Sequence, residues 1–565
     1  MKKLINNPRN IVREMLEGQA DLFPGQALLD SEDVIVRADL PSPGERRVAV
    51  ISGGGSGHEP AHAGYVGPGL LTAAVAGDVF TSPSVDAILA AIRAAAGPAG
   101  VVLIVKNYTG DRLNFGLAAE LAKQEGIPAE VVVVADDVAL QGLVEPERRR
   151  GIAGTVLIHK VAGAAAEAGR SVTEVAELAR AAAADLGSMG VALGACTVPS
   201  AGKPGFELGE AEIELGLGIH GEKGVERTAM KPVDELVDIM LDAIIRDRAL
   251  GAGARVALLV NGLGATPPME LAIVARRALA HLRGKGIAVA WAQAGDFLTA
   301  LEMPGCSLSV LRLGEERLGL LEAPASAPAW RGSGLIGAER RVATASRPAA
   351  AAIEAVVPGP LAAMLKQAAL AVAAAFEAAE AHLTDLDARA GDGDLGASMM
   401  RGAAAIRALP ESAWATPATA LSAVGDGLRR NIAGSSGPFY ATALLRAAGR
   451  LTDQPQPDVG SWDEAFAAAV ASVGEVGGAR PGDRTMLDAL DPALSAWMAA
   501  RQGGKPIAEA WAAAVAAAEA GASATASMMP KLGRASYLGA RALGSPDGGA
   551  VAITVWMKAL APFIR

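Results

Sequence analysis

The sequence is poor in cysteine, aromatic residues and histidine, and each shortage narrows what the protein can be. Only Cys196 and Cys306 occur in 565 residues, too few for a disulfide framework and without metal-site spacing. Aromatic residues make up 4% although hydrophobic residues reach 51%, so the cores must be built largely from alanine and aliphatic side chains. That composition favours closely packed helices and α/β layers. Because only six histidines are present, one that stands among glycines draws attention.

The chain also lacks an excess of positive charge and a long uninterrupted apolar run. Its net charge is −10, and no basic tract gives the footprint of a nucleic-acid binder. The mean hydropathy is +0.29, but no run of about 20 apolar residues lacks a charge or a helix breaker. We therefore attribute the positive hydropathy to the alanine content. Residues 1–12 have no apolar core of the kind a secretory signal needs. We therefore expect a soluble, cytoplasmic protein that binds neither nucleic acid nor membranes.

The length suggests two to four domains, and the first part of the chain alternates strand and helix patterns. Buried-strand patterns occur at 48–51, 101–105 and 131–134. This alternation predicts a mostly parallel sheet with helices on both faces. A second α/β portion is expected from about residue 190. One α/β domain would then span 1–325, with lobes of about 1–185 and 190–325.

The second part of the chain differs in kind. Prolines scattered through a stretch rich in Ala, Ser and Gly predict a linker over 326–357. From residue 358 to 565, alanine-rich segments follow helical spacing, as at Leu365, Val372 and Phe376. We find no convincing strand there, so this part should be an all-helical bundle. The fold class is multidomain, α/β followed by all-α.

Two polar clusters follow strands of the first lobe. Gly53–Glu59 is rich in glycine, which lets backbone N–H groups approach a ligand, and His58 is placed to act as a base. Lys106 and Asp111 share the loop after the next strand, where a lysine can bind substrate oxygens and a carboxylate can orient an imidazole. Ligands bind beyond the carboxyl ends of parallel strands. The alternatives are a glycine turn with a capping histidine and ordinary surface charges.

His220 lies in a third glycine-rich stretch, Glu214–Gly224, in the second lobe. Neutral imidazole acts as a base or as a nucleophile toward a carbonyl. Taken alone, the stretch also suits a surface loop whose histidine caps a neighbouring group. Loops from two facing sheets can form a cleft, where small-molecule sites are common.

The helical part carries an acidic turn with Asp387, Asp392 and Asp394. Three converging carboxylates repel one another unless a cation lies among them, and hard oxygen ligands favour Mg²⁺ with substrate phosphates. An EF-hand is excluded because its twelve-residue pattern with a terminal Glu is absent. A solvated acidic turn is the alternative.

Small breaks between the later helices are individually weak signals for a nucleotide. Exposed N–H groups at helix starts bind phosphate, and an arginine adds a planar charge clamp. These breaks contain Gly434–Gly437, Gly477-Gly478, Thr485-Met486 and Arg534. Together with the acidic turn they indicate a nucleotide–Mg²⁺ site.

With these motifs in hand, the sequence closely resembles the ATP-dependent dihydroxyacetone kinases of the triokinase family. The resemblance runs through nearly the whole chain. It rests on G-G-G-S-G-H-E-P from Gly53, K-N-Y-T-G-D-R from Lys106, G-I-H-G-E around His220, G-D-G-D from Gly391, P-G-D-R-T-M-L-D from Pro481 and G-R-A-S-Y-L-G from Gly533.

The resemblance implies a two-lobed α/β substrate domain and a C-terminal antiparallel helical barrel that binds Mg-ATP. It implies that His220 forms a hemiaminal with the ketone carbon of dihydroxyacetone, while His58 with Asp111 takes the proton from the attacking hydroxyl. The substrate hydroxyls would be held by Gly55, Ser56, Gly57, His58, Lys106 and Asp111. Two Mg²⁺ ions would be held by Asp387, Asp392 and Asp394. The nucleotide would be lined by Leu395, Gly396, Ala397, Ser398, Ser435, Ser436, Gly477, Thr485, Met486, Arg534, Asp547, Gly548 and Gly549. A homodimer is also expected.

One departure and several alternatives remain. The D-P-G stretch of the family reads Asp547-Gly548-Gly549 here, with the proline at Pro546, which can alter adenine contacts. The substrate can be a tetrulose such as erythrulose or also glyceraldehyde, and some relatives cyclise FAD. A phosphotransferase-system donor is disfavoured because both domains share one chain. A non-catalytic ketone sensor is disfavoured by the three intact aspartates.

Overall fold

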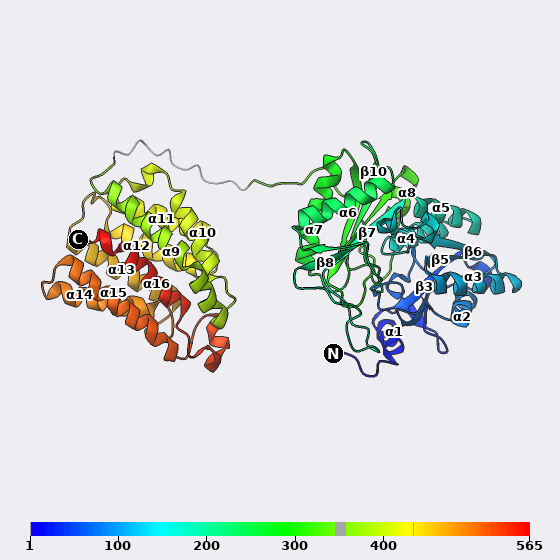
Figure 1. Ribbon diagram of the computed structural model, residues 1–565, viewed down its shortest axis with the longest axis horizontal. Helices are drawn as coiled ribbons and strands as arrows, with labels where there is room; N and C mark the ends of the chain where they lie inside the picture. The colour runs from blue at the N-terminus through cyan, green and yellow to red at the C-terminus, as the bar shows by residue number, and fades with distance from the viewer. Residues whose placement is uncertain (1, 345–357, 433) are drawn as a thin grey trace. The chain divides into compact units, whose positions relative to one another are not determined.

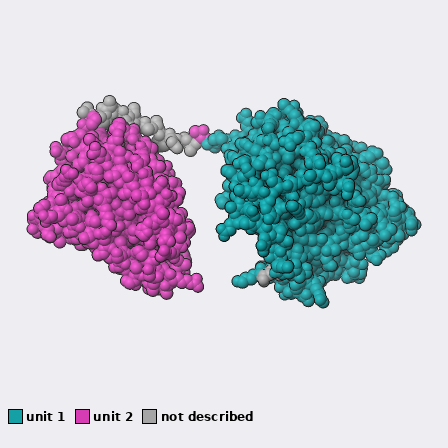
Figure 2. Space-filling view, in the orientation of Figure 1, with its two compact units in different colours: residues 1–343 teal, residues 344–565 magenta. Residues whose placement is uncertain are grey.

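The computed structural model describes residues 2–344, 358–432 and 434–565, apart from the side chain of Arg534. The chain forms two compact units, Met1–Ala343 and Thr344–Arg565, shown in teal and magenta in Figure 2. The predicted linker begins at 326, but residues 326–336 pack on the first unit. Trp330 is buried and stacks on Trp291 with ring centroids 5.8 Å apart, so this proline-containing segment is anchored. Residues 345–357 of that predicted linker lie outside the described residues.

The first lobe of unit 1 is built on a six-stranded sheet of order β1-β2-β4-β3-β5-β6. The four strands β4, β3, β5 and β6 are parallel, and β1 and β2, at one side of the sheet, are antiparallel. The strands are β1 (Gln26–Leu28), β2 (Val34–Arg37), β3 (Ala49–Ser56), β4 (Ala73–Val79), β5 (Val101–Lys106) and β6 (Ala129–Val134). The predicted parallel sheet is therefore confirmed.

Helices cover both faces of this sheet (Figure 1). On one face, α2 (Val85–Ala95) and α3 (Thr109–Gln124) bury a core with Ile51, Leu103 and Val105. On the other face lie α1 (Ile11–Leu22), α4 (Thr155–Glu167) and α5 (Val172–Ala184). The continuous apolar runs of β3 and β5 follow from this double burial.

The second lobe holds another six-stranded sheet, of order β11-β10-β12-β7-β8-β9, in which only β10 and β11 are parallel. The strands are β7 (Leu186–Ala192), β8 (Glu212–Leu215), β9 (Glu226–Ala229), β10 (Arg255–Gly262), β11 (Ala288–Gly295) and β12 (Gly305–Arg312), with helices α6 (Val233–Asp247), α7 (Pro268–Gly284) and α8 (Glu315–Glu322). One hydrophobic core contains α4 together with residues of both sheets. Nearly every residue of α4 is consequently buried, His159 and Lys160 included.

Unit 2 contains α-helices and short 3-10 turns, and no strand among its described residues. The helices are α9 (Ala362–Ala390), α10 (Leu395–Arg407), α11 (Pro417–Asn431), α12 (Ser436–Arg450), α13 (Val459–Gly477), α14 (Leu487–Gln502), α15 (Ile507–Ala524) and α16 (Gly548–Leu560). Each helix contacts the next along the chain, and α16 returns to contact α9. The predicted all-helical domain is thus confirmed, as a closed ring.

Helix α9 is long and apolar enough to span a membrane by length and composition alone. Alanine accounts for that property, and the helix packs against α10 and α16 as one wall of the ring.

Candidate functional site

The turn that carries His58 is fixed by contacts from the second lobe. Strand β3 continues through Ser56, so the predicted glycine turn is shorter than expected and Gly53–Ser56 belong to the strand. Gly57 has a φ of 97°, which favours glycine. The Leu301 N–H donates to Gly57 O at 2.7 Å, and the Thr299 N–H donates to His58 O at 3.1 Å. The turn is therefore held rigidly between the lobes.

His220 lies in a turn beyond β8 and is oriented by Glu222. The Glu222 carboxylate lies 2.8 Å from His220 Nδ1 and accepts the His220 backbone N–H at 2.9 Å. Burial opposes ionisation of Glu222, but the hydrogen bond and charge of His220 outweigh it and lower the pKa of Glu222 to about 2. An ionised carboxylate only accepts hydrogen bonds, so the Nδ1 atom of His220 carries a proton, and in the neutral ring its Nε2 atom bears the lone pair.

His58 is in the same tautomer for a different reason. Its Nδ1 atom lies 2.7 Å from the Thr299 carbonyl oxygen, which can only accept. The Nε2 atom of His58 therefore also bears a lone pair, and it lies 3.1 Å from the Nε2 atom of His220. Burial, the charge of Lys106 and His220 lower the pKa of His58 well below its usual 6.5. When both rings are neutral, two imidazole acceptors thus face each other, and a proton or another cation between them removes the repulsion.

Lys106 and Asp111 supply unsatisfied polar atoms beside this pair. Lys106 ends β5, and Asp111 lies in the first turn of α3 rather than on a loop as expected. Both side chains are buried, and Lys106 Nζ and Asp111 Oδ1 have no hydrogen-bond partner among the described residues. A Cβ added at Gly54 would lie 3.0 Å from Lys106 Nζ and 3.6 Å from Asp111 Oδ2. Buried orphan groups of this kind are costly unless a ligand satisfies them.

Two expectations for this lobe change. The hydrogen-bond partner that orients His58 is the Thr299 carbonyl and not Asp111. Ser56 Oγ donates to Gly77 O at 2.7 Å, inside the sheet, so its hydroxyl proton is already engaged. A Cβ added at Gly55 would lie 2.5 Å from the Thr81 nitrogen, which makes glycine necessary there by packing.

Sequence reasoning missed several residues of this cluster. Glu222 stands two residues after His220 in the quoted motif, so its spacing was the available signal. Phe80 stacks on the His58 ring at 5.1 Å, and Tyr108 meets the His220 ring edge-on at 4.6 Å. Tyr108 lies inside the quoted K-N-Y-T-G-D-R motif, so that motif was the available signal, whereas no local pattern marks Phe80 or Thr299.

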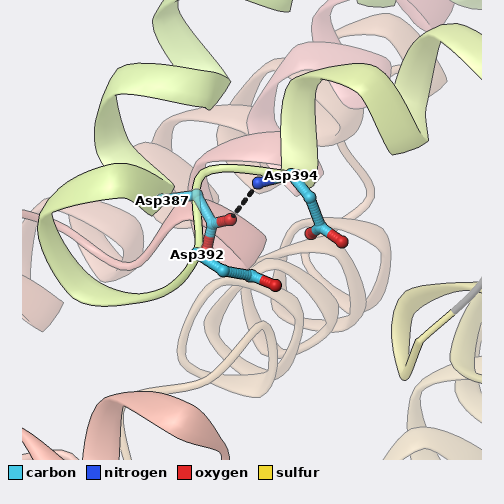
Figure 3. A group of neighbouring side chains, drawn as sticks. All are labelled: Asp387, Asp392 and Asp394. Atoms are coloured by element: carbon cyan, nitrogen blue, oxygen red, sulfur yellow. Dashed lines mark hydrogen bonds between the residues drawn. The ribbon is translucent and has the colours of Figure 1, made fainter. Parts of the chain in front are cut away.

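The acidic turn of unit 2 brings its three carboxylates together, as Figure 3 shows. Asp387, in the last turn of α9, and Asp392 and Asp394, before α10, each offer an oxygen within 4.8 Å of the others. Asp387 Oδ2 accepts the backbone N–H groups of Asp394 and Leu395 at 2.8 and 3.2 Å. The turn is thereby closed on itself. Converging hard oxygen atoms are the donor set that Mg²⁺ prefers, so these residues fit a magnesium site.

The residues predicted to line a nucleotide lie at helix ends. Asp394 and Asp547 precede the N-termini of α10 and α16, Ser435 precedes α12, Met486 precedes α14, and Gly477 ends α13. The backbone of Arg534 opens the 3-10 turn Arg534–Tyr537. Free N–H groups at such N-termini suit phosphate.

Some of these ends are in direct proximity to the acidic turn. A Cβ added at Gly548 would lie 2.8 Å from Leu395 and 4.0 Å from the Asp387 nitrogen, and one at Gly549 would lie 3.9 Å from Met486. Burial raises the pKa of Asp547 to about 6, although the hydrogen bond that its carboxylate accepts from the Ala550 N–H lowers the pKa. The ends of α9, α10, α14 and α16 therefore meet at one place.

Other predicted nucleotide residues have packing roles. Gly396 lies where α10 crosses α9, because a Cβ there would fall 2.1 Å from Thr384 Oγ1 and 2.3 Å from Glu380 O. The buried Arg484, which sequence reasoning did not single out, donates to the carbonyls of Thr525, Ala542 and Ser545. It thereby fixes the segment leading to Asp547.

The fold and these two clusters are those expected of a small-molecule enzyme: a pair of imidazoles in an α/β unit and a turn of converging carboxylates in a helical unit. Comparison with known proteins gives the family. The Dak1 domain matches residues 17–329 and the DAK2 domain matches residues 389–562. The triokinase/FMN cyclase of Homo sapiens is 43% identical over 571 residues, covering 99% of this chain and 98% of that protein. The D-erythrulose kinase of Mycolicibacterium smegmatis is 37% identical over 576 residues, with 99% and 98% covered.

A solved structure agrees with both units. The crystal structure of the dihydroxyacetone kinase from C. freundii in complex with AMP-PNP and Mg²⁺ is 36% identical, with a TM-score of 0.64 and 99% of each chain covered. The chain belongs to the dihydroxyacetone kinase family, in which a Dak1 and a DAK2 domain are fused, and this kinase family uses ATP and Mg²⁺.

Proposed function

We propose that the protein phosphorylates dihydroxyacetone to dihydroxyacetone phosphate with ATP as the donor, and also accepts glyceraldehyde. The observation that carries the proposal is the His220 ring, whose Nε2 lone pair is exposed to the His58 side while Glu222 holds its Nδ1–H. Residues 1–343 would form the substrate domain and 344–565 the nucleotide domain. We further propose a cytoplasmic homodimer.

Capture of the ketone follows from the tautomer of His220. The Nε2 lone pair adds to the carbonyl carbon, and the carbonyl electron pair moves to oxygen, which takes a proton from solvent. The ring becomes positively charged as the N–C bond forms, and the Glu222 carboxylate at 2.8 Å stabilises that charge. An alcohol such as glycerol has no carbonyl to attack and is excluded.

The neighbouring groups would bind and deprotonate the captured sugar. Lys106 Nζ and Asp111 Oδ1 lack partners and would bind its hydroxyl groups. The neutral Nε2 atom of His58 would accept the proton of the hydroxyl that attacks phosphorus. The backbone N–H group of Gly55 would complete the substrate contacts, whereas that of Gly57 already donates to the Glu59 carboxylate at 3.1 Å.

In unit 2, the aspartate turn would hold Mg²⁺, which neutralises charge on the donor phosphates when bound. The other predicted residues would line the nucleotide: Leu395–Ser398, Ser435, Ser436, Gly477, Thr485, Met486, Arg534 and Asp547–Gly549. Phosphoryl transfer then depends mainly on positioning and charge.

A ketotetrose is the second candidate substrate, supported by the 37% identity to a D-erythrulose kinase. Addition of His220 requires a ketone in the sugar but does not depend on the length of its carbon chain. Comparing kcat/KM for dihydroxyacetone and erythrulose decides between them. The kinase proposal itself fails if neither sugar yields a phosphorylated product in the presence of Mg-ATP.

A further inference from the structure

The facing Nε2 atoms of His58 and His220 form a pair of possible metal ligands. The Mg²⁺ of the proposed kinase reaction would be held elsewhere, in the aspartate turn. Each Nδ1–H is committed, one to the Thr299 carbonyl and the other to Glu222. In the neutral rings two lone pairs therefore point at one another across 3.1 Å. In a neutral pair no hydrogen lies between them, so the arrangement is repulsive until a donor or a cation enters.

We propose that this pair is a binding site for a borderline-soft divalent cation such as Zn²⁺ or Co²⁺, and that the ion competes with the keto sugar. Zinc–imidazole bonds of about 2.0–2.1 Å place two ligand nitrogens about 3.3 Å apart in a tetrahedral site. The observed separation of 3.1 Å is close to that value. Both rings are in the tautomer that a metal needs, so no ring proton has to leave.

The surrounding charges act on a cation in both directions. The ammonium group of Lys106 disfavours positive charge on His58, whereas the carboxylates of Asp111, Glu59 and Glu222 act on Lys106 in the opposite sense. Asp111 Oδ1 is buried without a partner, and water can complete the coordination. Each His Nδ1–H is held by an oxygen, the arrangement typical of histidine ligands in metal sites.

The two cation sites would differ in preference. The aspartate turn offers hard oxygen atoms and suits Mg²⁺, whereas imidazole suits zinc, cobalt and nickel. A cation on His220 Nε2 occupies the lone pair that would attack the ketone. The inhibitory consequence rests on the proposed function, but binding of the cation does not.

The test is a titration of the full chain with Co²⁺, followed by visible absorption. The aspartate turn is first removed with Asp387→Asn, Asp392→Asn and Asp394→Asn, so that one site remains. His281, which lies between Asp238 and Asp242 at 2.8 and 2.9 Å, is a competing histidine site on the surface, and His281→Ala serves as the matched control. Circular dichroism checks folding, and His220→Asn replaces His220→Ala if the latter is unfolded.

We expect one Co²⁺ per chain in the background variant, unchanged by His281→Ala, and a loss of affinity of more than about tenfold on His220→Ala. Saturating dihydroxyacetone should weaken Co²⁺ binding in the same background. Equal affinity after His220→Ala, or loss of the ion on His281→Ala, would overturn the inference. If the ketone bonds to His220 but Co²⁺ does not bind, the metal site alone fails. If Co²⁺ binds and no ketone adduct forms, the kinase proposal loses its support and the metal site stands.

Discussion

The carboxylate of Glu222 lies 2.8 Å from Nδ1 of His220 and accepts the backbone N–H of the same residue. One acid thus fixes the ring, its tautomer and the turn that carries it. The role of this contact is testable because glutamine keeps the size and an accepting oxygen but loses the charge.

Glu222→Gln should lower kcat/KM for dihydroxyacetone about 10- to 100-fold, because the charged ring formed on ketone addition loses its counter-ion. Steady-state kinetics with saturating Mg-ATP measures the effect. Glu226→Gln, a nearby exposed acid on β9, is the matched control and should leave the rate unchanged. Wild-type kinetics in Glu222→Gln would contradict the assignment.

Asp392→Asn should abolish phosphoryl transfer while leaving ketone capture intact. The substitution removes one of three carboxylates that approach within 4.8 Å and belongs to the other compact unit. Product formation and ketone binding are measured on the same preparation. Loss of ketone binding in Asp392→Asn would show that the two activities are not divided between the units.

The stability of unit 1 should fall as the pH drops below 6.5, because burial and the charge of Lys106 lower the pKa of His159 to about 3. An unfolded histidine titrates near 6.5. Between these values the unfolded chain binds more protons, so the unfolding free energy declines by up to about 1.4 kcal/mol per pH unit for this histidine. The ring of His62 lies 3.0 Å from that of His159. Burial and the charge of Lys106 also lower the pKa of His62, so this residue adds to the slope.

Urea denaturation between pH 7.5 and 5 measures this dependence. His159→Gln should flatten it, whereas His382→Gln, on an exposed position of α9, should not. An identical slope in His159→Gln would refute the explanation.

Gly396→Ala should destabilise unit 2 by about 1–3 kcal/mol, because its methyl group would meet Thr384 Oγ1 and the Glu380 carbonyl. The α9–α10 junction also carries the acidic turn, so affinity for Mg-ATP should fall as well. Gly449→Ala in α12 is the control, since nothing lies within 4 Å of an added Cβ there, and it should be neutral or stabilising. Calorimetry of the full chain measures the melting temperature of each variant. Equal melting temperatures of the two variants would contradict the packing argument.

The periodicity of apolar residues predicts much of the fold, but the sequence predicts the site only in part. Continuous apolar runs predicted the parallel sheet, and alanine-rich helical spacing predicted the all-helical unit. The end of the first unit was misplaced because Pro324, Pro328 and neighbouring small residues resemble a linker, whereas stacking of Trp330 on Trp291 is a contact across the chain. Local patterns do not encode such contacts.

The same limit applies to the orientation of His58. Sequence spacing suggested Asp111 as its partner, yet the Thr299 carbonyl, 241 residues away, holds the ring. A backbone oxygen has no side-chain signature, so no motif could have identified it. The acidic turn was easier, because Asp387, Asp392 and Asp394 lie within eight residues and one turn brings them together.

The most direct test is carbon NMR of the full chain with dihydroxyacetone labelled with ¹³C at its carbonyl carbon. We predict that bound sugar loses the ketone resonance and gains one typical of a tetrahedral carbon, and that His220→Ala shows no such signal. A bound sugar that keeps its ketone resonance in the wild-type protein, or a tetrahedral signal that persists in His220→Ala, would contradict the account.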